Sequence, residues 1–347
     1  MNIYIKDVSH ISNQEPFLEN WFENPIIYNQ NYIRSIDPDY KQFFSAIESR
    51  RLGIILKRAL ATAINLTQKT GIQNPDAIIT GTGLGCIENT EKFLNAMIDN
   101  DEEMLTPSYF MQSTHNTISS QIAIRLKCHG YNSTYSHCGT SFDSALFDAF
   151  MQFQLGEINT AIVAAHDELT PDYFKLLEKI KYWKNGEISE EILRKAEDYG
   201  SFAGEAAVAF MISNEEDNNN WAKIKKFEMF NKQPNCEKLE ELNINSDEID
   251  AVVVGLSGDK ENDNVYKNFY QKYFKSKPII WYKHIFGESY SVSGLGLYVA
   301  ATIIKKQKIT EHLIFEANKI PKTINKILFY NHFQNKSHSL ILLEKSK

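Results

Sequence analysis

Apolar runs and amphipathic segments alternate along most of this chain. Apolar positions at helical spacing predict helices at residues 88–100, 142–156, 262–273 and 290–305. Short apolar runs bounded by glycines or polar residues predict strands at residues 76–80, 160–165, 203–212, 249–254 and 278–282. Strands that are apolar along their whole length, with helices between them, are typical of a parallel sheet covered on both faces. The pattern therefore predicts an α/β fold.

Other stretches are less regular. We expect a strand at residues 2–5, one helix over residues 37–63 and one helix with a polar start over residues 110–124. A helical segment is expected at residues 236–242. Two final strands, 326–330 and 339–343, are joined by a predicted loop, Asn331–His338. Charged residues at about 170–200 resemble a helical insertion, and the polar run 214–220 separates two predicted domains, residues 1–214 and 215–347, which are alike in element order.

Composition narrows the class of protein. The chain has 347 residues, of which 43% are hydrophobic and 23% charged, values typical of a globular protein. The net charge of −7 argues against nucleic acid or an anionic membrane as the main partner. We find no apolar run long enough to span a membrane and no signal-peptide pattern. Four cysteines lack metal-type or disulfide-type spacing, so we expect a reduced, cytoplasmic protein with no metal and no cofactor.

Two motifs have a plain structural reading beside a functional one. Residues 81–85 read Gly-Thr-Gly-Leu-Gly, which is an incomplete dinucleotide motif and is better explained as a tight turn. Arg50, Arg51, Lys57 and Arg58 form a basic group that is explained by a solvated helix face, although an acidic carrier protein would also fit such a surface.

Cys138 is the candidate nucleophile. It follows a strand-like run and precedes an amphipathic helix, for which Thr140 or Ser141 is a plausible N-cap. A helix N-terminus favours a thiolate over a thiol. Three readings stay open: a small structural residue, a thiol that accepts acyl groups, and a complete condensing site. The last reading requires a histidine base from elsewhere, for which the candidates are His115, His137, His166, His284 and His332.

Five motifs in order give the chain a family resemblance. It resembles the β-ketoacyl synthases of the thiolase fold at the Gly81–Gly85 turn, Pro107 to Asn116, the Cys138 turn, Gly204–Ala207, and Lys283 five residues before Glu288. The resemblance implies two pseudo-repeated βαβαβ halves in a layered αβαβα arrangement. Asp37-Pro38-Asp39, Arg50-Arg51 and Thr114 to Ile118 are more narrowly similar to the chain length factors of bacterial aryl polyene and flexirubin pathways.

The family's two active-site histidines have no counterpart here. In active members they bind the malonyl thioester and stabilise its enolate. Their positions correspond to Gly255, counted back from Asn262-Asp263, and to Glu288 after Gly287. A carboxylate at the second position disfavours a nearby enolate or thiolate, and we expect Glu288 to pair with Lys283. Residues 331–336 replace the family's glycine-rich loop, which puts an oxyanion hole at that place in doubt.

These departures favour a non-catalytic or weakly catalytic chain length factor. Such a subunit forms a heterodimer with an active β-ketoacyl synthase, acts on acyl chains held by an acyl carrier protein, and shapes the acyl tunnel across the interface. The expected tunnel and interface residues are Phe110, Met111, Ser113, Thr114, Asn116 and Thr117, for which ordinary packing is the plain alternative. The functional alternatives are an unorthodox condensing or acyl-transfer enzyme that uses Cys138, and a scaffold that retains only the fold.

Overall fold

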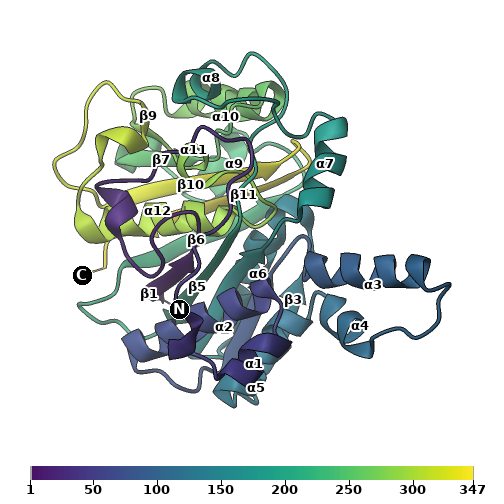
Figure 1. Ribbon diagram of the computed structural model, residues 1–347. Coiled ribbons are helices and arrows are strands. Elements are labelled where there is room, and N and C mark those ends of the chain that lie inside the picture. Colours follow the sequence, from purple (N-terminus) through teal and green to yellow (C-terminus); the bar gives the residue numbers. More distant parts are fainter. Residues whose placement is uncertain (1, 347) are drawn as a thin grey trace.

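One hydrogen-bonded sheet runs through the whole molecule. The computed structural model describes residues 2–346 and places eleven strands from this range in that sheet (Figure 1). They are β1 Ile3–Ile11, β2 Ala77–Gly81, β3 Tyr131–Tyr135, β4 Thr160–Asp167, β5 Ala206–Ser213, β6 Ala222–Phe230, β7 Ala251–Val254, β8 Ile279–Trp281, β9 Ile314–Glu316, β10 Lys326–Phe333 and β11 Ser337–Glu344.

The pairing pattern of the strands in one half of the sheet recurs in the other half, counted outward from the centre. The order is β3-β2-β4-β5-β1-β6-β11-β10-β7-β8-β9. In each half two parallel neighbours flank a central strand: β3 and β4 pair with β2, and β8 and β10 pair with β7. An antiparallel pair, β1 with β6, joins the halves. We propose that the turn between β5 and β6 separates the two halves and that residues 170–200 are an insertion into the first.

Helices cover the sheet in layers. The helices are α1 Ala46–Arg51, α2 Ile54–Thr70, α3 Ile87–Asp99, α4 Pro107–Ser113, α5 Thr117–Leu126, α6 Ser141–Leu155, α7 Pro171–Lys179, α8 Glu190–Lys195, α9 Cys236–Glu241, α10 Lys260–Tyr273, α11 Lys283–Phe286 and α12 Ser293–Lys306. Short 3₁₀ turns lie at Asn20–Phe22, Tyr40–Gln42, Cys138–Thr140, Ser246–Glu248 and Glu311–Leu313.

Three apolar cores separate the layers. The first lies between the sheet and α2 with α5, and includes Leu56, Ile122 and Ile162. The second surrounds α6 and α12, which contact each other and the strands of both halves. The third lies under α10 and includes Phe269. The two halves of the sheet thus lie on either side of α6 and α12. The layers are therefore α, β, α, β, α, as the thiolase fold implies.

Most predicted elements are confirmed, but two single helices are each broken. Residues 37–63 form a 3₁₀ turn, α1 and α2, because the backbone at Leu52 and Gly53 is extended. Residues 110–124 span α4 and α5, separated at Thr114, whose backbone is also extended. Thr117 Oγ1 donates to Met111 O at 3.1 Å and satisfies one of the carbonyls that the break leaves free. Apolar periodicity continues across both breaks and hides them.

The predicted C-terminal loop is wrong. Asn331 and His332 belong to β10, which pairs with β11 up to Phe333 and Ser337. The chain reverses at Gln334 and Asn335, whose φ angles of 50° and 53° both lie in the left-handed region. Such a pair of residues makes the tight turn that suits a twisted hairpin. Pattern reading also missed β6, in which three lysines interrupt the apolar positions, and it ended β1 six residues early.

An arm projects from this layered body. Helices α3 and α4 pack on each other and extend away from the rest of the chain (Figure 1). The arm begins directly after the Gly81–Gly85 turn and returns to the body at α5. None of the helices in residues 2–346 is long and apolar enough to cross a membrane.

Candidate functional site at the Cys138 turn

Cys138 lies in a constrained turn between β3 and α6. Its φ of 49° is in the left-handed region, which costs a non-glycine residue energy and occurs often at functional sites. Ser141 holds the turn, because its hydroxyl donates to Cys138 O at 2.7 Å and accepts from His137 N at 2.8 Å. The Cys138 side chain is exposed just ahead of α6. The prediction of a cysteine at a helix start is therefore confirmed.

The surroundings of the Cys138 thiol decide whether a histidine can act as its base. Cys138 is a free, exposed cysteine, and none of the hydrogen bonds found among residues 2–346 joins its sulfur to a histidine. The ring of its neighbour His137 is exposed and lies 3.2 Å, measured from Nδ1, from the hydroxyl of Ser144. Nucleophilic activation requires a base within about 2.6–3.2 Å of the thiol. The Cys138 turn thus has the backbone of a nucleophile site without its base.

The first histidine position is occupied by other side chains. Gly255 follows β7, and a Cβ atom built on it would lie 2.6 Å from Tyr266 Oη and 2.9 Å from Lys283 Cε. Tyr266 is fully buried, and its hydroxyl accepts a hydrogen bond from His332 N at 3.2 Å. A side chain at residue 255 therefore requires both neighbours to move.

The second position carries an ion pair. Glu288 Oε2 lies 2.6 Å from Lys283 Nζ, which confirms the expected pairing. Burial raises the pKa of Glu288, and the Lys283 ammonium opposes that rise. Lys283 reaches this carboxylate from the first turn of α11, directly after β8. Lys283 and Glu288 are thus paired with each other.

His332 is held away from Cys138. Its Nε2 faces Asn262 O at 2.9 Å, and its Nδ1 accepts from Asn335 N at 3.3 Å. Because Nδ1 is an acceptor, Nε2 carries the proton and the ring is neutral. Burial lowers the pKa of His332 to about 3. Both ring nitrogens of His332 therefore form hydrogen bonds to backbone groups of the C-terminal hairpin and α10.

The other candidate histidines have structural surroundings. His284 stacks on Trp281 with ring centroids 3.8 Å apart and contacts His312 O through Nε2 at 2.9 Å. His166 is fully buried at the end of β4, and burial lowers its pKa to about 3. His115 packs beside Gly85 at the base of the arm. None of these rings contacts the Cys138 sulfur.

A network that sequence reasoning missed ties the Cys138 turn to the C-terminal hairpin. Asn331 Nδ2 donates to Asp143 Oδ2 at 3.0 Å and to Gly139 O at 3.3 Å, and Ser339 donates to the same carboxylate. Burial raises the pKa of Asp143, which these donors partly offset. An aspartate inside an otherwise apolar helix start was the available signal. Asn331 and Ser339, from the two strands of the C-terminal hairpin, thus hold the start of α6 by polar contacts.

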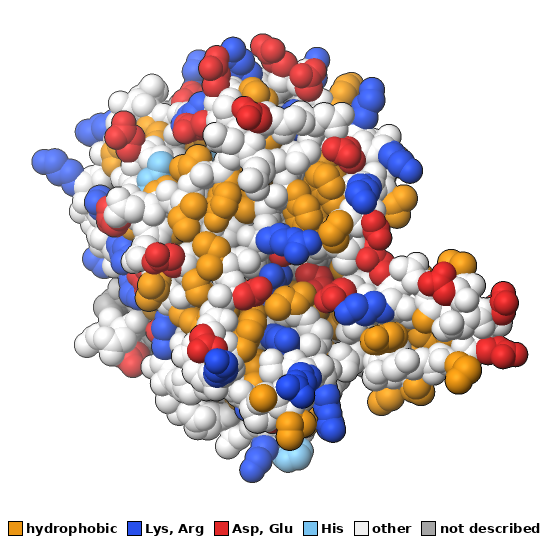
Figure 2. Space-filling view, in the orientation of Figure 1, with side chains coloured by type: hydrophobic (Ala, Val, Ile, Leu, Met, Phe, Trp, Pro, Cys, Tyr) orange, Lys and Arg blue, Asp and Glu red, His pale blue; other side chains and the backbone are white. Residues whose placement is uncertain are grey.

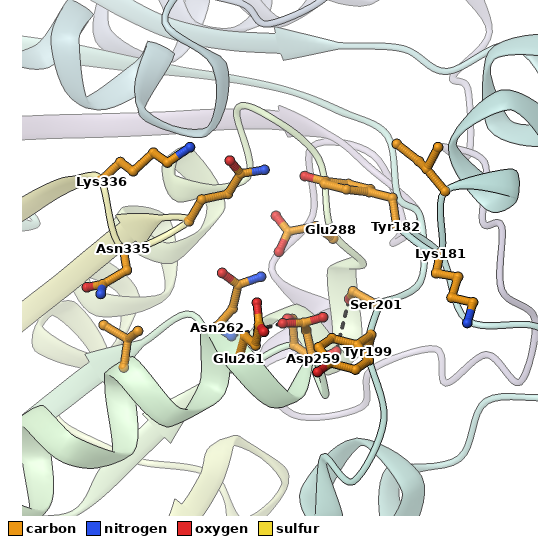
Figure 3. Close-up of a pocket in the computed structure, with 14 residues that line it drawn as sticks. Lys181, Tyr182, Tyr199, Ser201, Asp259, Glu261, Asn262, Glu288, Asn335 and Lys336 are labelled. Carbon is orange, nitrogen blue, oxygen red and sulfur yellow. Dashed lines mark hydrogen bonds between the residues drawn. The ribbon is translucent and has the colours of Figure 1, made fainter.

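A polar cavity of about 640 Å³ adjoins Glu288. Figure 3 shows Glu288 and Tyr182 on one side of it and Asp259, Glu261 and Asn262 on the other. Asp259 Oδ1 accepts from Asn262 N at 2.9 Å, so this acidic group is part of the helix cap of α10. Residues 2–346 contain no cluster of three or more side chains arranged to hold a metal ion.

The predicted interface segment lies on the arm and at its base. Phe110 and Met111 on α4 are 57% and 70% exposed, and Thr114 and Asn116 are also exposed. Ser113 is half-buried, while Thr117 is buried at the start of α5. Figure 2 shows apolar side chains on the surface of the arm, and the exposed apolar residues there include Leu94, Ile98, Met104, Phe110 and Met111. An apolar surface of this kind is typical of a protein interface.

Comparison with known structures identifies this fold. The ishigamide ketosynthase/chain length factor superposes with a TM-score of 0.77 at 14% identity, covering 100% of this chain and 99% of that one. A β-ketoacyl synthase from Burkholderia phymatum gives 0.79 at 11% identity, covering 100% of both chains. The complex of a ketosynthase (ApeO) with its chain length factor (ApeC) from Xenorhabdus doucetiae gives 0.76 at 13%, covering 99% and 98%.

Sequence comparison agrees with the structural one. A search of curated proteins finds no significant match. The sequence profile of the β-ketoacyl synthase N-terminal domain, however, matches residues 19–234, a range that contains the Cys138 turn and strands β2 to β6. With this match and the layered fold, the chain belongs to the β-ketoacyl synthase family.

Proposed function

We propose that this protein is a non-catalytic or weakly catalytic chain length factor in the cytoplasm. It pairs with an active β-ketoacyl synthase and shapes the acyl tunnel while that enzyme extends a polyene-type acyl chain on an acyl carrier protein. The observation that carries the proposal is the state of the two histidine positions. Tyr266 and Lys283 fill the space at Gly255, and Glu288 is paired with Lys283.

The chemistry of condensation explains why these positions matter. Decarboxylation of a malonyl thioester creates an enolate, which requires hydrogen-bond donors aimed at its oxygen. Glu288 offers an acceptor, and its carboxylate disfavours a second negative charge nearby. Lys283 is the adjacent donor, but its ammonium already bonds to Glu288 at 2.6 Å. The chain therefore lacks the electrostatics of the decarboxylation step.

The proposed partner surface combines the arm with a free sheet edge. β3 is the terminal strand of the sheet, and its first residues, Tyr131 and Asn132, are exposed. An unpaired edge strand readily accepts another strand. The arm lies beside β3 (Figure 1), and its helix α4 carries the exposed residues Phe110 and Met111. A ketosynthase paired along β3 would meet α4, so that side chains of α4 lie beside its acyl tunnel.

Two relatives support the pairing and the substrate class. One solved structure is described as a ketosynthase in complex with its chain length factor, and another as a type II acyl-carrier protein in complex with its ketosynthase. The second is 12% identical with a TM-score of 0.74 and covers 99% of both chains. Partners of these two classes are what we propose for this protein.

Reconstituted condensation tests the proposal. The purified chain, a catalytic ketosynthase and the copurified pair are each incubated with malonyl- and acyl-carrier protein, and the β-ketoacyl product is measured by mass spectrometry. We expect no product from the chain alone, and product from the pair that is unchanged by Cys138→Ala in this chain. Product from the chain alone that disappears with Cys138→Ala would overturn the proposal. If no ketosynthase copurifies, a scaffold role replaces it.

A second candidate function rests on the exposed, strained Cys138. It is acyl transfer without decarboxylation, in which the thiol attacks an acyl thioester, the carrier thiol leaves, and an acyl-cysteine remains. Intact-mass analysis after incubation with acyl-carrier protein measures this step. Cys236 is also exposed and provides the control. Loading that requires Cys138 and not Cys236 would favour this function.

A further inference from the structure

A series of contacting aromatic rings extends from the Cys138 turn into the first half of the molecule. The rings of Phe333 and Tyr290 have centroids 6.0 Å apart, and those of Tyr290 and Tyr182 are 6.3 Å apart. Tyr182 meets Trp183 edge-on at 4.7 Å, and Trp183 stacks on Phe174 at 6.1 Å. These residues come from β10, the start of the α12 region, the insertion and α7. Segments distant in sequence thus supply one continuous aromatic wall.

The wall begins directly at the nucleophile turn. A Cβ atom on Gly139 would lie 2.3 Å from the Phe333 ring, so the backbone beside Cys138 rests on that ring. Burial raises the pKa of Tyr182 and of Tyr290, and electrostatic interactions with neighbouring groups, among them Cys138, raise both further. Both tyrosines therefore lie within electrostatic range of Cys138.

Tyr290 occupies space that the backbone leaves for it. A Cβ atom on Gly83 would lie only 2.2 Å from Tyr290 Cβ, so this glycine permits the close approach of the tyrosine. Tyr290 is one wall of a small space of about 10 Å³, whose other walls include Leu84, Leu169, Leu177, Tyr182, Trp183 and the acidic residues Asp167, Glu168 and Glu288. That volume is roughly what one water molecule needs. Most of the exposed wall surface is apolar, but no acyl chain fits between the walls.

The structure assigns Tyr290 the role of a plug that closes this apolar pocket beside Cys138 to acyl chains. The inference rests on the proposed function and deepens it, because it says why a chain with an exposed family cysteine does not store the growing acyl group. The ligand class excluded is a linear acyl thioester longer than a few carbons. With the plug reduced in size, alkyl carbons attached to Cys138 enter the pocket next to Leu84 and Leu177.

Chain-length-dependent alkylation of Cys138 tests the plug. The probes are N-ethylmaleimide and N-octylmaleimide, in which the sulfur bonds to one alkene carbon and the other takes up a proton, with no leaving group. Peptide mass spectrometry follows the label at Cys138. The alkylation rate with N-octylmaleimide is divided by the rate with N-ethylmaleimide. An effect of a mutation on the reactivity of the thiol itself cancels in this ratio. Tyr290→Ala is compared with Tyr199→Ala, since Tyr199 lines the polar cavity instead.

We expect an octyl-to-ethyl ratio no greater than one in the wild type and in Tyr199→Ala. In Tyr290→Ala we expect the ratio to rise roughly fifteen-fold, because each buried methylene favours binding roughly four-fold and two of them fit. Tyr290→Leu serves as a second variant if the alanine variant fails to fold, with a smaller rise. An unchanged ratio in a folded variant, or a high ratio in the wild type, overturns the inference.

The outcome is distinguishable from a failure of the proposed function. Alkylation uses the isolated chain and needs no partner, whereas the proposed function is tested by condensation with a ketosynthase. A raised ratio together with condensation by the chain alone would support the plug and overturn the chain length factor role. An unchanged ratio together with condensation that requires the partner would overturn the plug and support the chain length factor role.

Discussion

Lys283 Nζ lies 2.6 Å from Glu288 Oε2, and both side chains are largely withdrawn from solvent, with 6% and 15% exposed. The pair sits where a reactive site would need a donor free to meet its substrate. Because two opposite charges are buried together, neither can be removed without leaving the other uncompensated.

Lys283→Met is expected to destabilise the protein by about 3–5 kcal/mol, because the mutation leaves a buried carboxylate without its partner. Urea unfolding measures the change. Lys308→Met is the matched control, since Lys308 pairs with Glu23 at 2.7 Å on the surface, and removing such a pair costs about 0–1 kcal/mol. Equal losses in the two variants would show that the Lys283–Glu288 pair is not buried in solution.

Gly255→Ala is expected to cost about 1–3 kcal/mol, because the new methyl group collides with Tyr266 Oη and Lys283 Cε. Adding Tyr266→Phe removes the closer of these two atoms and should recover part of the loss. Thermal unfolding of the single and double variants makes the comparison. Gly255→His meets the same obstacle, so restoring this histidine alone should not produce condensation. A neutral effect of Gly255→Ala would contradict the packing around residue 255.

Glu168 predicts a pH dependence of stability. Its carboxylate is buried and accepts from Ile55 N and Glu88 N, both at 3.2 Å, at the starts of α2 and α3. Burial raises the pKa of Glu168 to about 8 from a usual value of 4.5. Between these values the folded state binds more protons than the unfolded state, so the contribution of this group is complete below about pH 4.5 and is lost as pH rises through about 8.

Glu168→Gln should therefore remove a downward slope in the free energy of unfolding between pH 5 and 8, of at most about 1.4 kcal/mol per pH unit. Urea unfolding at several pH values measures the slope. Exposed Glu261 supplies the control, because Glu261→Gln should keep the wild-type slope. The same slope in wild type and Glu168→Gln would mean that this carboxyl ionises normally in the fold.

His332→Gln should leave the chemistry of Cys138 unchanged. The ring of His332 bonds to Asn262 O and Asn335 N and not to the thiol. The rate of alkylation by iodoacetamide, measured from pH 6 to 10, should have the same profile in the wild type and the variant. A profile displaced toward higher pH in His332→Gln would instead identify this histidine as a base for Cys138.

Phe110→Asp should abolish pairing with a ketosynthase while leaving the isolated chain folded. Its side chain is 57% exposed, so a charge there costs little in the free chain but much in an apolar interface. Leu176→Asp is the matched control, because Leu176 on α7 is also 57% exposed and lies outside the arm. Copurification with a tagged ketosynthase measures pairing. Loss of pairing in both variants, or in neither, would argue against the arm as the interface.

Apolar periodicity predicted an element correctly where the buried face of that one element sets the spacing of its apolar residues. The helix after Cys138 was predictable because Phe142, Leu146 and Phe153 repeat at helical spacing, and α6 buries that face. The Lys283–Glu288 pair was also predictable, because one turn of helix and a glycine bring the two residues together. The break at Thr114 was not, since it depends on a side-chain bond from Thr117 rather than on the apolar pattern.

The candidate site shows the other limit of the sequence. Gly255 and Glu288 were visible in the sequence at the positions where the resemblance implies histidines, but the packing around them was not. The hairpin at Gln334 and Asn335 was read as a loop, although a left-handed pair of residues reverses the chain there. His332 was consequently assigned to that loop as one of five candidate bases, whereas strand pairing turns its ring into the hairpin and toward α10.

The amino-acid sequence by itself determined most of the strands and helices, the cysteine ahead of a helix, and the presence of Gly255 and Glu288 where the resemblance implies histidines, because each depends on local spacing or residue identity. Tertiary structure alone decided what surrounds those two residues. Asn331 meets Gly139 across 192 residues, and Tyr290 fills the space beside Gly83. Contacts between such distant residues depend on how layers pack, and packing leaves no periodic signal in any one segment.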